Sequence, residues 1–133
     1  MKISVAMATY NGAQYIEEQL ESIRIQTMPV NEVRICDDGS SDDTVEVICH
    51  YIREHGLESS WSVEVNQENL GYASNFMKAV GLTNGDYVFF CDQDDIWIAD
   101  RAERMIGLME AHPDMLLLGS EFDSFVSAKD APS

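Results

Sequence analysis

Three aspartates gather within four positions directly after an apolar, β-prone run. The run Phe89–Cys91 leads into Asp92, Asp94 and Asp95, and no Lys or Arg stands among them. Carboxylates this close repel one another unless a cation neutralises them. Mg²⁺ and Mn²⁺ prefer oxygen ligands, and Mg²⁺ completes its shell with water and substrate phosphate. The cluster therefore predicts a divalent-metal site that faces a diphosphate. The alternative is a solvated acidic turn before the next helix.

A second acidic pair follows another short apolar run. Asp37 and Asp38 come after residues 32–36 and precede Gly39. A carboxylate at the end of a strand can accept a hydrogen bond from a base N–H or a ribose hydroxyl. The alternative is an Asx turn with no ligand. The expected position of this pair beside the first acidic cluster favours a role in binding.

Two further turns carry residue types suited to a ligand. The segment Ala8-Thr9-Tyr10 offers backbone that can approach a ligand and an aromatic ring that can stack on a base. An ordinary strand-to-helix turn would look the same. In the turn that begins at Asn69, Gly71 allows close approach of the backbone, and Asn75 follows as a candidate for the same site.

The elements that must position these turns alternate between strand and helix character. Alternation of buried-looking strands with helices predicts an α/β fold, a three-layer α/β/α arrangement with a mostly parallel sheet. Such sheets bind ligands beyond the carboxyl ends of their strands, so the four polar turns should meet in one site. Asp43 and Glu46 predict a capping box on the second helix. The expected strands are 2–8, 32–36, 61–65, 86–91 and 115–118, and the expected helices lie around residues 16–23, 45–52, 73–80 and 102–109.

Composition narrows the class of ligand. The chain has 133 residues, which fits one domain, and a formal net charge of -16. Nucleic acids and anionic membranes are excluded as partners, because both need clustered Lys and Arg. The chain contains no signal peptide and no apolar run near the ~20 residues of a membrane span. Its three cysteines form no metal-binding pair. We therefore expect a cytoplasmic protein with reduced cysteines, or one held at the inner face of the membrane through further regions or partners.

Other nucleotide-binding classes lack their defining parts. The first strand is followed by neither a Gly-x-Gly-x-x-Gly motif nor a P-loop. A phospho-acceptor receiver domain would need an acidic pair after the first strand, where Thr9 and Tyr10 stand instead. The histidines are scattered on polar helical segments, which is typical of surface residues.

Four motifs together resemble family-2 glycosyltransferases with the GT-A fold, in order and in spacing, over residues 1 to about 120. The stretch Cys91–Trp97 is similar to bacterial rhamnosyltransferase-type members. The motifs are Ser4–Gly12, Asp37–Asp42, Asn69–Gly71 and Asp92–Asp95.

The resemblance implies a metal-dependent transfer, with inversion, of a sugar from a UDP- or dTDP-sugar to a glycan or lipid-linked glycan in bacterial surface polysaccharide synthesis. Residues 1–120 would be the donor-binding domain, with Mn²⁺ or Mg²⁺ bridging the diphosphate. Asp94 and Asp95 would bind the metal, although the presence of three aspartates leaves open which of them do so. The implied donor-binding residues are Ala8, Thr9, Tyr10, Asp38 with Asp37 as a second candidate, Asn69, Gly71, Asn75, Asp92 and Asp94.

One departure from the family pattern concerns catalysis. Family members continue into a further half with acceptor contacts and a carboxylate general base. Glu121 and Asp123 lie too near the aspartate cluster to fill that role. We therefore expect a truncated chain without its general base, in which residues 121–133 are a loose tail or the start of the acceptor half. A catalytically silent nucleotide-binding or interaction module is the alternative, and an exposed surface favours homo-oligomers.

Overall fold

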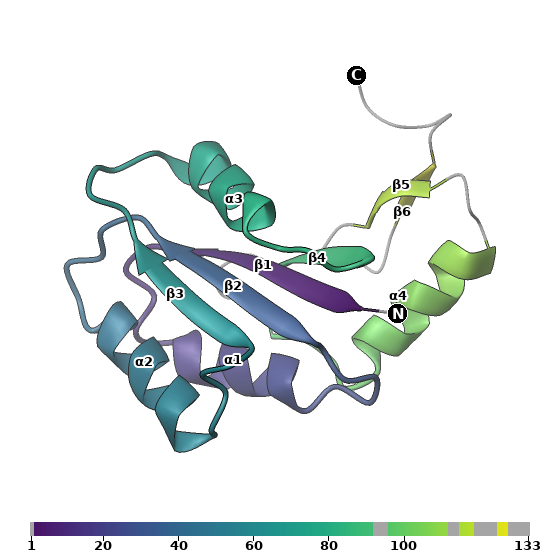
Figure 1. Cartoon of the computed structure of the whole chain (residues 1–133), viewed down its shortest axis with the longest axis horizontal. Coiled ribbons are helices and arrows are strands. Elements are labelled where there is room, and N and C mark those ends of the chain that lie inside the picture. The colour runs from purple at the N-terminus through teal and green to yellow at the C-terminus, as the bar shows by residue number, and fades with distance from the viewer. Residues whose placement is uncertain (1, 92–95, 112–114, 119–124, 128–133) are drawn as a thin grey trace.

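The computed structural model describes residues 2–91, 96–111, 115–118 and 125–127. Four parallel strands form its main sheet in the order β3-β2-β1-β4. Figure 1 shows α3 on one face of this sheet and α1 with α2 on the other. The elements are β1 (Ile3–Thr9), α1 (Ile16–Arg24), β2 (Glu32–Asp37), α2 (Thr44–Glu54), β3 (Trp61–Val65), α3 (Tyr72–Gly81), β4 (Tyr87–Cys91), α4 (Arg101–Ala111), β5 (Met115–Leu118) and β6 (Phe125–Ser127).

The predicted three-layer α/β/α architecture is confirmed. Alternate residues of β1 point to opposite faces, as the two-residue period of a strand requires. Val5 and Met7 join the larger core beneath α1, α2 and α4, whereas Ala6 packs with Cys36 and Ala79 under α3. Both tryptophans are buried in the larger core. Among the described helices, none is both long and apolar enough to cross a membrane.

Two local expectations are corrected. The fifth strand forms, but β5 pairs antiparallel with β6 and does not join the parallel sheet. Antiparallel neighbours need only a short connection, and β6 is the nearest partner along the chain. Strand β6 lies within residues 121–133, the stretch expected to be a loose tail or the start of the acceptor half. The capping box is absent: Asp43 makes no side-chain cap bond, and Asp42 instead accepts from the Thr44 N–H at 3.0 Å.

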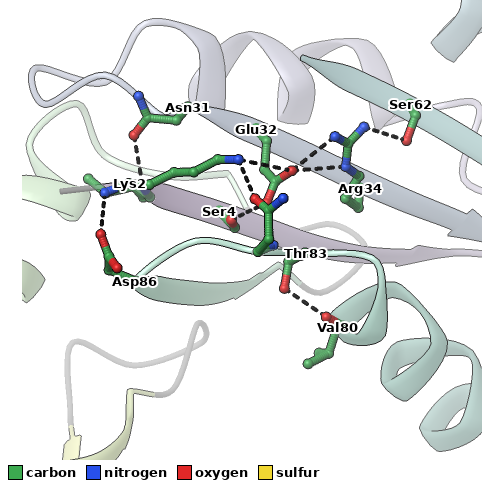
Figure 2. A network of polar contacts seen from close by, with 11 residues as sticks. Lys2, Ser4, Asn31, Glu32, Arg34, Ser62, Val80, Thr83 and Asp86 are labelled. Carbon is green, nitrogen blue, oxygen red and sulfur yellow. Dashed lines mark hydrogen bonds and ion pairs between the residues drawn. The ribbon is translucent and has the colours of Figure 1, made fainter. Parts of the chain in front are cut away.

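A buried carboxylate organises the amino-terminal end of the sheet (Figure 2). Glu32 is 2% exposed, and its Oε2 accepts from the Ser4 hydroxyl at 2.5 Å and from the Asn84 N–H at 2.7 Å. Its Oε1 lies 2.9 Å from Arg34 Nη2 and 3.8 Å from Lys2 Nζ. This network ties β1, β2 and the connection that leads into β4 to one another.

The same network controls the protonation of Glu32. Burial alone would raise the pKa of this carboxyl. The Asn84 N–H, the Ser4 hydroxyl and the charges of Arg34 and Lys2 outweigh burial and hold the pKa below its ordinary value of 4.5. Glu32 is therefore ionised at neutral pH, and its charge is part of what stabilises the fold.

Replacing Glu32 by Gln is expected to lower the free energy of unfolding at neutral pH by about 1–3 kcal/mol, because buried donors lose a charged acceptor. The folded-state pKa is depressed, so this stabilisation is present above about pH 4.5 and is lost as pH falls through the folded-state value. Urea unfolding from about pH 7 to about pH 3 should show the gap between wild type and variant closing. The exposed Glu58→Gln variant is the control. A gap that does not change with pH would contradict the assignment.

Candidate functional site

A cavity of about 430 Å³ opens at the carboxyl ends of the central strands. It lies at the ends of β1 and β2, and the strand order reverses at β1, because β2 and β4 flank this strand on opposite sides. Open α/β sheets bind ligands at such switch points, and this volume suits a small molecule. The residues that line the cavity are Ala8, Thr9, Tyr10, Asp38, Asn69, Gly71, Tyr72 and Asn75.

Seven of these eight residues are sequence-predicted donor-binding candidates, and they come from three segments: the end of β1, the turn after β2, and the turn before α3 together with the start of that helix. Tyr72 is the one that sequence reasoning missed, although an aromatic residue directly after Gly71 was a usable signal. Asp37 is buried and does not line the cavity. Asp92, Asp94 and Asp95 lie outside the described residues.

Asp37 supports the site from behind. Its side chain is fully buried, and Oδ1 accepts from the hydroxyls of Thr9 at 2.7 Å and Ser40 at 2.6 Å. Its Oδ2 accepts from the backbone N–H groups of Ser40 at 2.7 Å and Gly39 at 3.1 Å. Four donors match the acceptor capacity of a carboxylate. Asp37 therefore joins the end of β1 to the turn after β2.

Asp38 faces the cavity and holds the third turn. It is 6% exposed, and its Oδ1 accepts from the Asn66 amide at 2.9 Å and the Leu70 N–H at 2.7 Å. Its Oδ2 accepts from the Gly71 N–H at 3.0 Å. Burial would raise the pKa of Asp38, but these three donors keep it below the usual value, so the carboxylate is charged at neutral pH. When only hydrogen bonds between described residues are counted, Asp38 Oδ2 accepts one bond and can accept one more.

Two tyrosines line the cavity, and one lining residue, Gly71, has an unusual backbone conformation. Tyr10 is 48% exposed and Tyr72 is 62% exposed, so both rings present surface to a ligand. Tyr72 meets Phe76 edge-on at 5.2 Å between centroids. Gly71 adopts φ 85°, a conformation that favours glycine and turns its N–H onto Asp38.

Helix α1 fixes the chain on both sides of residues 92–95. Strand β4 ends at Cys91, opposite Met7 in the register with β1, so the chain leaves the sheet beside Ala8. Within α1, Gln19 Nε2 donates to Cys91 Sγ at 3.2 Å, and Ser22 Oγ accepts from the Trp97 N–H at 3.0 Å. These side chains are buried.

Gln26, just beyond α1, completes this attachment. Its Nε2 donates to the Ile98 carbonyl at 2.8 Å, and its Oε1 accepts from the Ala102 N–H at 2.8 Å. Within the part of the chain that the structure describes, no group of three or more His, Cys, Asp or Glu side chains could hold a metal ion. The aspartates predicted to bind one remain sequence-based candidates.

The chain belongs to glycosyl transferase family 2, because the sequence profile of that family matches residues 4–129. It is 34% identical over 107 residues to TuaG of Bacillus subtilis strain 168, a protein named for teichuronic acid biosynthesis. It is 39% identical over 103 residues to the dTDP-rhamnosyl transferase RfbG of Shigella flexneri. It is 31% identical over 107 residues to WfgD of Escherichia coli, named as a UDP-Glc:alpha-D-GlcNAc-diphosphoundecaprenol beta-1,3-glucosyltransferase.

Solved structures agree with this family and with the GT-A fold predicted from the sequence. The S. aureus TarS 1–349 complex with UDP has a TM-score of 0.74 and 30% identity, covering 88% of this chain and 35% of that one. The mannosyltransferase PcManGT from Pyrobaculum calidifontis, in complex with GDP-Man and Mn²⁺, has a TM-score of 0.75 and 26% identity, covering 81% and 32%. The three sequence matches cover 80%, 75% and 80% of this chain but only 41%, 35% and 40% of TuaG, RfbG and WfgD.

Replacing Asp37 by Asn is expected to lower the free energy of unfolding by about 2–4 kcal/mol, since buried donors lose their acceptor and meet a new N–H₂ group. Asp43→Asn is the matched control, because Asp43 is exposed and makes no cap bond; its effect should stay within about 0.5 kcal/mol. Denaturant titration of both variants measures the difference. Equal stability would refute the supporting role.

Gln26→Ala is expected to loosen the chain after residue 95, because the Ile98 carbonyl and the Ala102 N–H lose their partner. Amide hydrogen exchange over residues 96–103 should become at least about tenfold faster than in wild type. The exposed Gln14→Ala variant on the amino-terminal side of α1 is the control. Unchanged exchange in Gln26→Ala would show that the attachment does not depend on this side chain.

Proposed function

We propose that this chain binds a UDP- or dTDP-sugar together with Mn²⁺ or Mg²⁺ and supplies the donor half of a glycosyltransferase. One observation carries the proposal: the same cavity, at the carboxyl ends of β1 and β2, is lined by candidate residues from three segments of the chain. The sugar would pass to a glycan or lipid-linked glycan in bacterial surface polysaccharide synthesis. The UDP bound to TarS and the acceptor named for WfgD support these classes of donor and acceptor.

The base and ribose are the parts of the donor that the cavity suits. Asp38 is charged and retains one acceptor position on Oδ2 for a base N–H or a ribose hydroxyl. Tyr10 and Tyr72 offer ring faces for stacking. The Thr9 hydroxyl already donates to Asp37, so the backbone of this turn is the part that meets the ligand.

The diphosphate needs a positive charge that the cavity itself does not supply. Among the described residues, those that line it include no Lys or Arg. Asp94 and Asp95, with Asp92 beside them, follow β4 where its end lies next to the cavity residue Ala8. Their oxygens are the ligand type that Mn²⁺ and Mg²⁺ prefer. A bound cation would neutralise the diphosphate and stabilise it as the leaving group. PcManGT was solved with both GDP-Man and Mn²⁺, which supports a divalent cation beside the nucleotide-sugar.

Direct displacement at the sugar carbon, with inversion, additionally needs a carboxylate to take the proton of the acceptor hydroxyl. Glu121 and Asp123 lie outside the described residues, and we assign the general base to neither. Because the chain spans 41% or less of the three relatives, acceptor binding is proposed for the whole protein. Hydrolysis or transfer of the donor sugar would distinguish this enzyme from a silent nucleotide-binding module.

We place the protein in the cytoplasm. Cys36, Cys49 and Cys91 form no disulfide bond, which fits a reducing compartment. The homo-oligomer expected from the sequence stays a prediction.

Calorimetry of UDP and dTDP, with and without Mn²⁺, tests the donor site. Wild type should bind with Mn²⁺, and an Asp94→Ala, Asp95→Ala double variant should bind at least about tenfold more weakly in its presence, because the diphosphate loses its cation. A Glu17→Ala, Glu18→Ala double variant makes the same change in charge at exposed positions and should bind like wild type. The proposal fails if wild type binds neither nucleotide.

A further inference from the structure

The outer edge of strand β3 is open. This strand stands at the end of the order β3-β2-β1-β4, so one of its edges has no neighbouring strand in the described part of the chain. Figure 1 shows it at the border of the sheet, on the side of α2. It contains no proline and pairs with β2 without a bulge, so nothing in the strand itself hinders a further neighbour. The edge is therefore suited to the addition of another strand.

The backbone of β3 directs every second residue to this open edge. At its start, the Val33 N–H donates to the Ser60 carbonyl at 3.0 Å, and at its end the Asn66 N–H donates to the Asp37 carbonyl at 2.8 Å. The polar groups of successive residues in a strand point to opposite edges. The even-numbered residues of β3 therefore bond to β2, and the odd-numbered ones, Trp61, Val63 and Val65, direct their N–H and C=O groups outward.

A second copy of β3, running antiparallel, satisfies these outward groups in one register. With Val63 opposite Val63 of the second copy, Trp61 lies opposite Val65, and the whole strand Trp61–Val65 is paired. The two Val63 residues then exchange both of their backbone hydrogen bonds. The Val65 N–H of each copy reaches the Trp61 carbonyl of the other. The Trp61 N–H needs no new partner, because it already donates to the Leu57 carbonyl at 2.8 Å.

Charges on the α3 face of the sheet favour this register. Ser62 and Glu64 lie on that face, since they pair with Arg34 and with Cys36, which packs under α3. The register places Glu64 opposite Ser62 of the second copy. Arg34 Nη1 donates to Ser62 Oγ at 3.0 Å, and the Arg34 side chain is 25% exposed, so the incoming carboxylate meets a positive charge. A register centred on Glu64 would instead set two carboxylates against each other, which is unfavourable.

The opposite face of the strand has a groove and an exposed apolar side chain that fits it. The groove, of about 230 Å³, lies between β3 and α2, and Ile52, Trp61 and Val63 are among its lining residues. Val65 belongs to the same face of the strand and is 51% exposed. In the register centred on Val63, each Val65 lies against Trp61 of the other copy, at this groove. Pairing therefore removes apolar surface from water on both copies.

We propose that this chain forms a two-fold symmetric homodimer through antiparallel pairing of β3, which joins two main sheets into one continuous sheet. The two copies run in opposite directions, so their cavities open at opposite ends of the joined sheet, and each cavity stays complete within one copy. A single strand and a small groove give less than the roughly 1,200–2,000 Å² of a standard interface. We therefore expect a weak dimer, with a dissociation constant of about 10–100 µM.

Sedimentation velocity over a concentration series from about 5 µM to 500 µM tests the dimer. Salt of about 0.3 M screens the repulsion between two chains that each carry a net charge of -16. Val65→Asp should weaken dimerisation at least about tenfold, because it brings a charge against Trp61 on both sides of the two-fold axis. Val63→Pro removes an outward N–H and no bond to β2, and should have a similar effect. Ile25→Asp is the matched control, because Ile25 is also 51% exposed but lies at the end of α1.

Residue-resolved amide exchange of wild type, followed by NMR, identifies the interface and its register. The N–H groups of Val63 and Val65 should exchange at least about twofold more slowly above the dissociation constant than below it. Those of Ser62 and Glu64 already bond to β2 and should change little. A wild type that stays monomeric overturns the inference, and so does a dimer that leaves the exchange of Val63 and Val65 unchanged. Dimerisation that survives Val65→Asp also overturns it. Circular dichroism checks that each variant is folded, and the exchange measurement decides the question should a variant not fold.

Discussion

Two adjacent buried carboxylates hold the candidate site together. Asp37 and Asp38 follow one another at the end of β2 and serve different turns: Asp37 binds the end of β1 and its own turn, and Asp38 binds the turn before α3. Neither has a Lys or Arg as a direct hydrogen-bond partner in the described part of the chain. Neutral N–H and O–H donors stabilise both charges, as buried charged groups require.

Each end of the sheet holds a buried carboxylate, and the two carboxylates are stabilised in different ways. At the amino-terminal end, Glu32 is balanced by Arg34 and Lys2 as well as by hydrogen bonds. At the carboxyl-terminal end, Asp38 is held by hydrogen bonds, and its link to Lys78 passes through Asn66. A direct ion pair would occupy the acceptor positions of Asp38. An indirect one leaves room for a ligand, which is consistent with a site at this end.

The sequence predicted the layers of the fold and most of the cavity for a general reason. Hydrophobic periodicity identifies strands and helices, and parallel strands bring the turns at their carboxyl ends together. The sequence did not show which of Asp37 and Asp38 lines the cavity, because only the folded sheet determines which of two successive side chains faces it. Glu32, Asn66 and Lys78 were missed because their partners are set by packing: Glu32 accepts from Asn84, 52 positions away. The partner of β5 and the missing cap at Asp43 likewise depend on local geometry that residue types do not specify.

The turn before α3 already binds an anionic group, and that group is the Asp38 carboxylate of the protein itself. Leu70 and Gly71 direct successive N–H groups at Asp38, the arrangement by which many proteins bind phosphate. With an internal carboxylate in that position, the Leu70 and Gly71 N–H groups are already engaged and do not face an incoming phosphate. A ligand that enters the cavity therefore meets negative charge at the place where a phosphate-binding loop would present positive charge. Recognition at this point favours groups that donate hydrogen bonds, and the phosphates of the proposed donor would be held elsewhere.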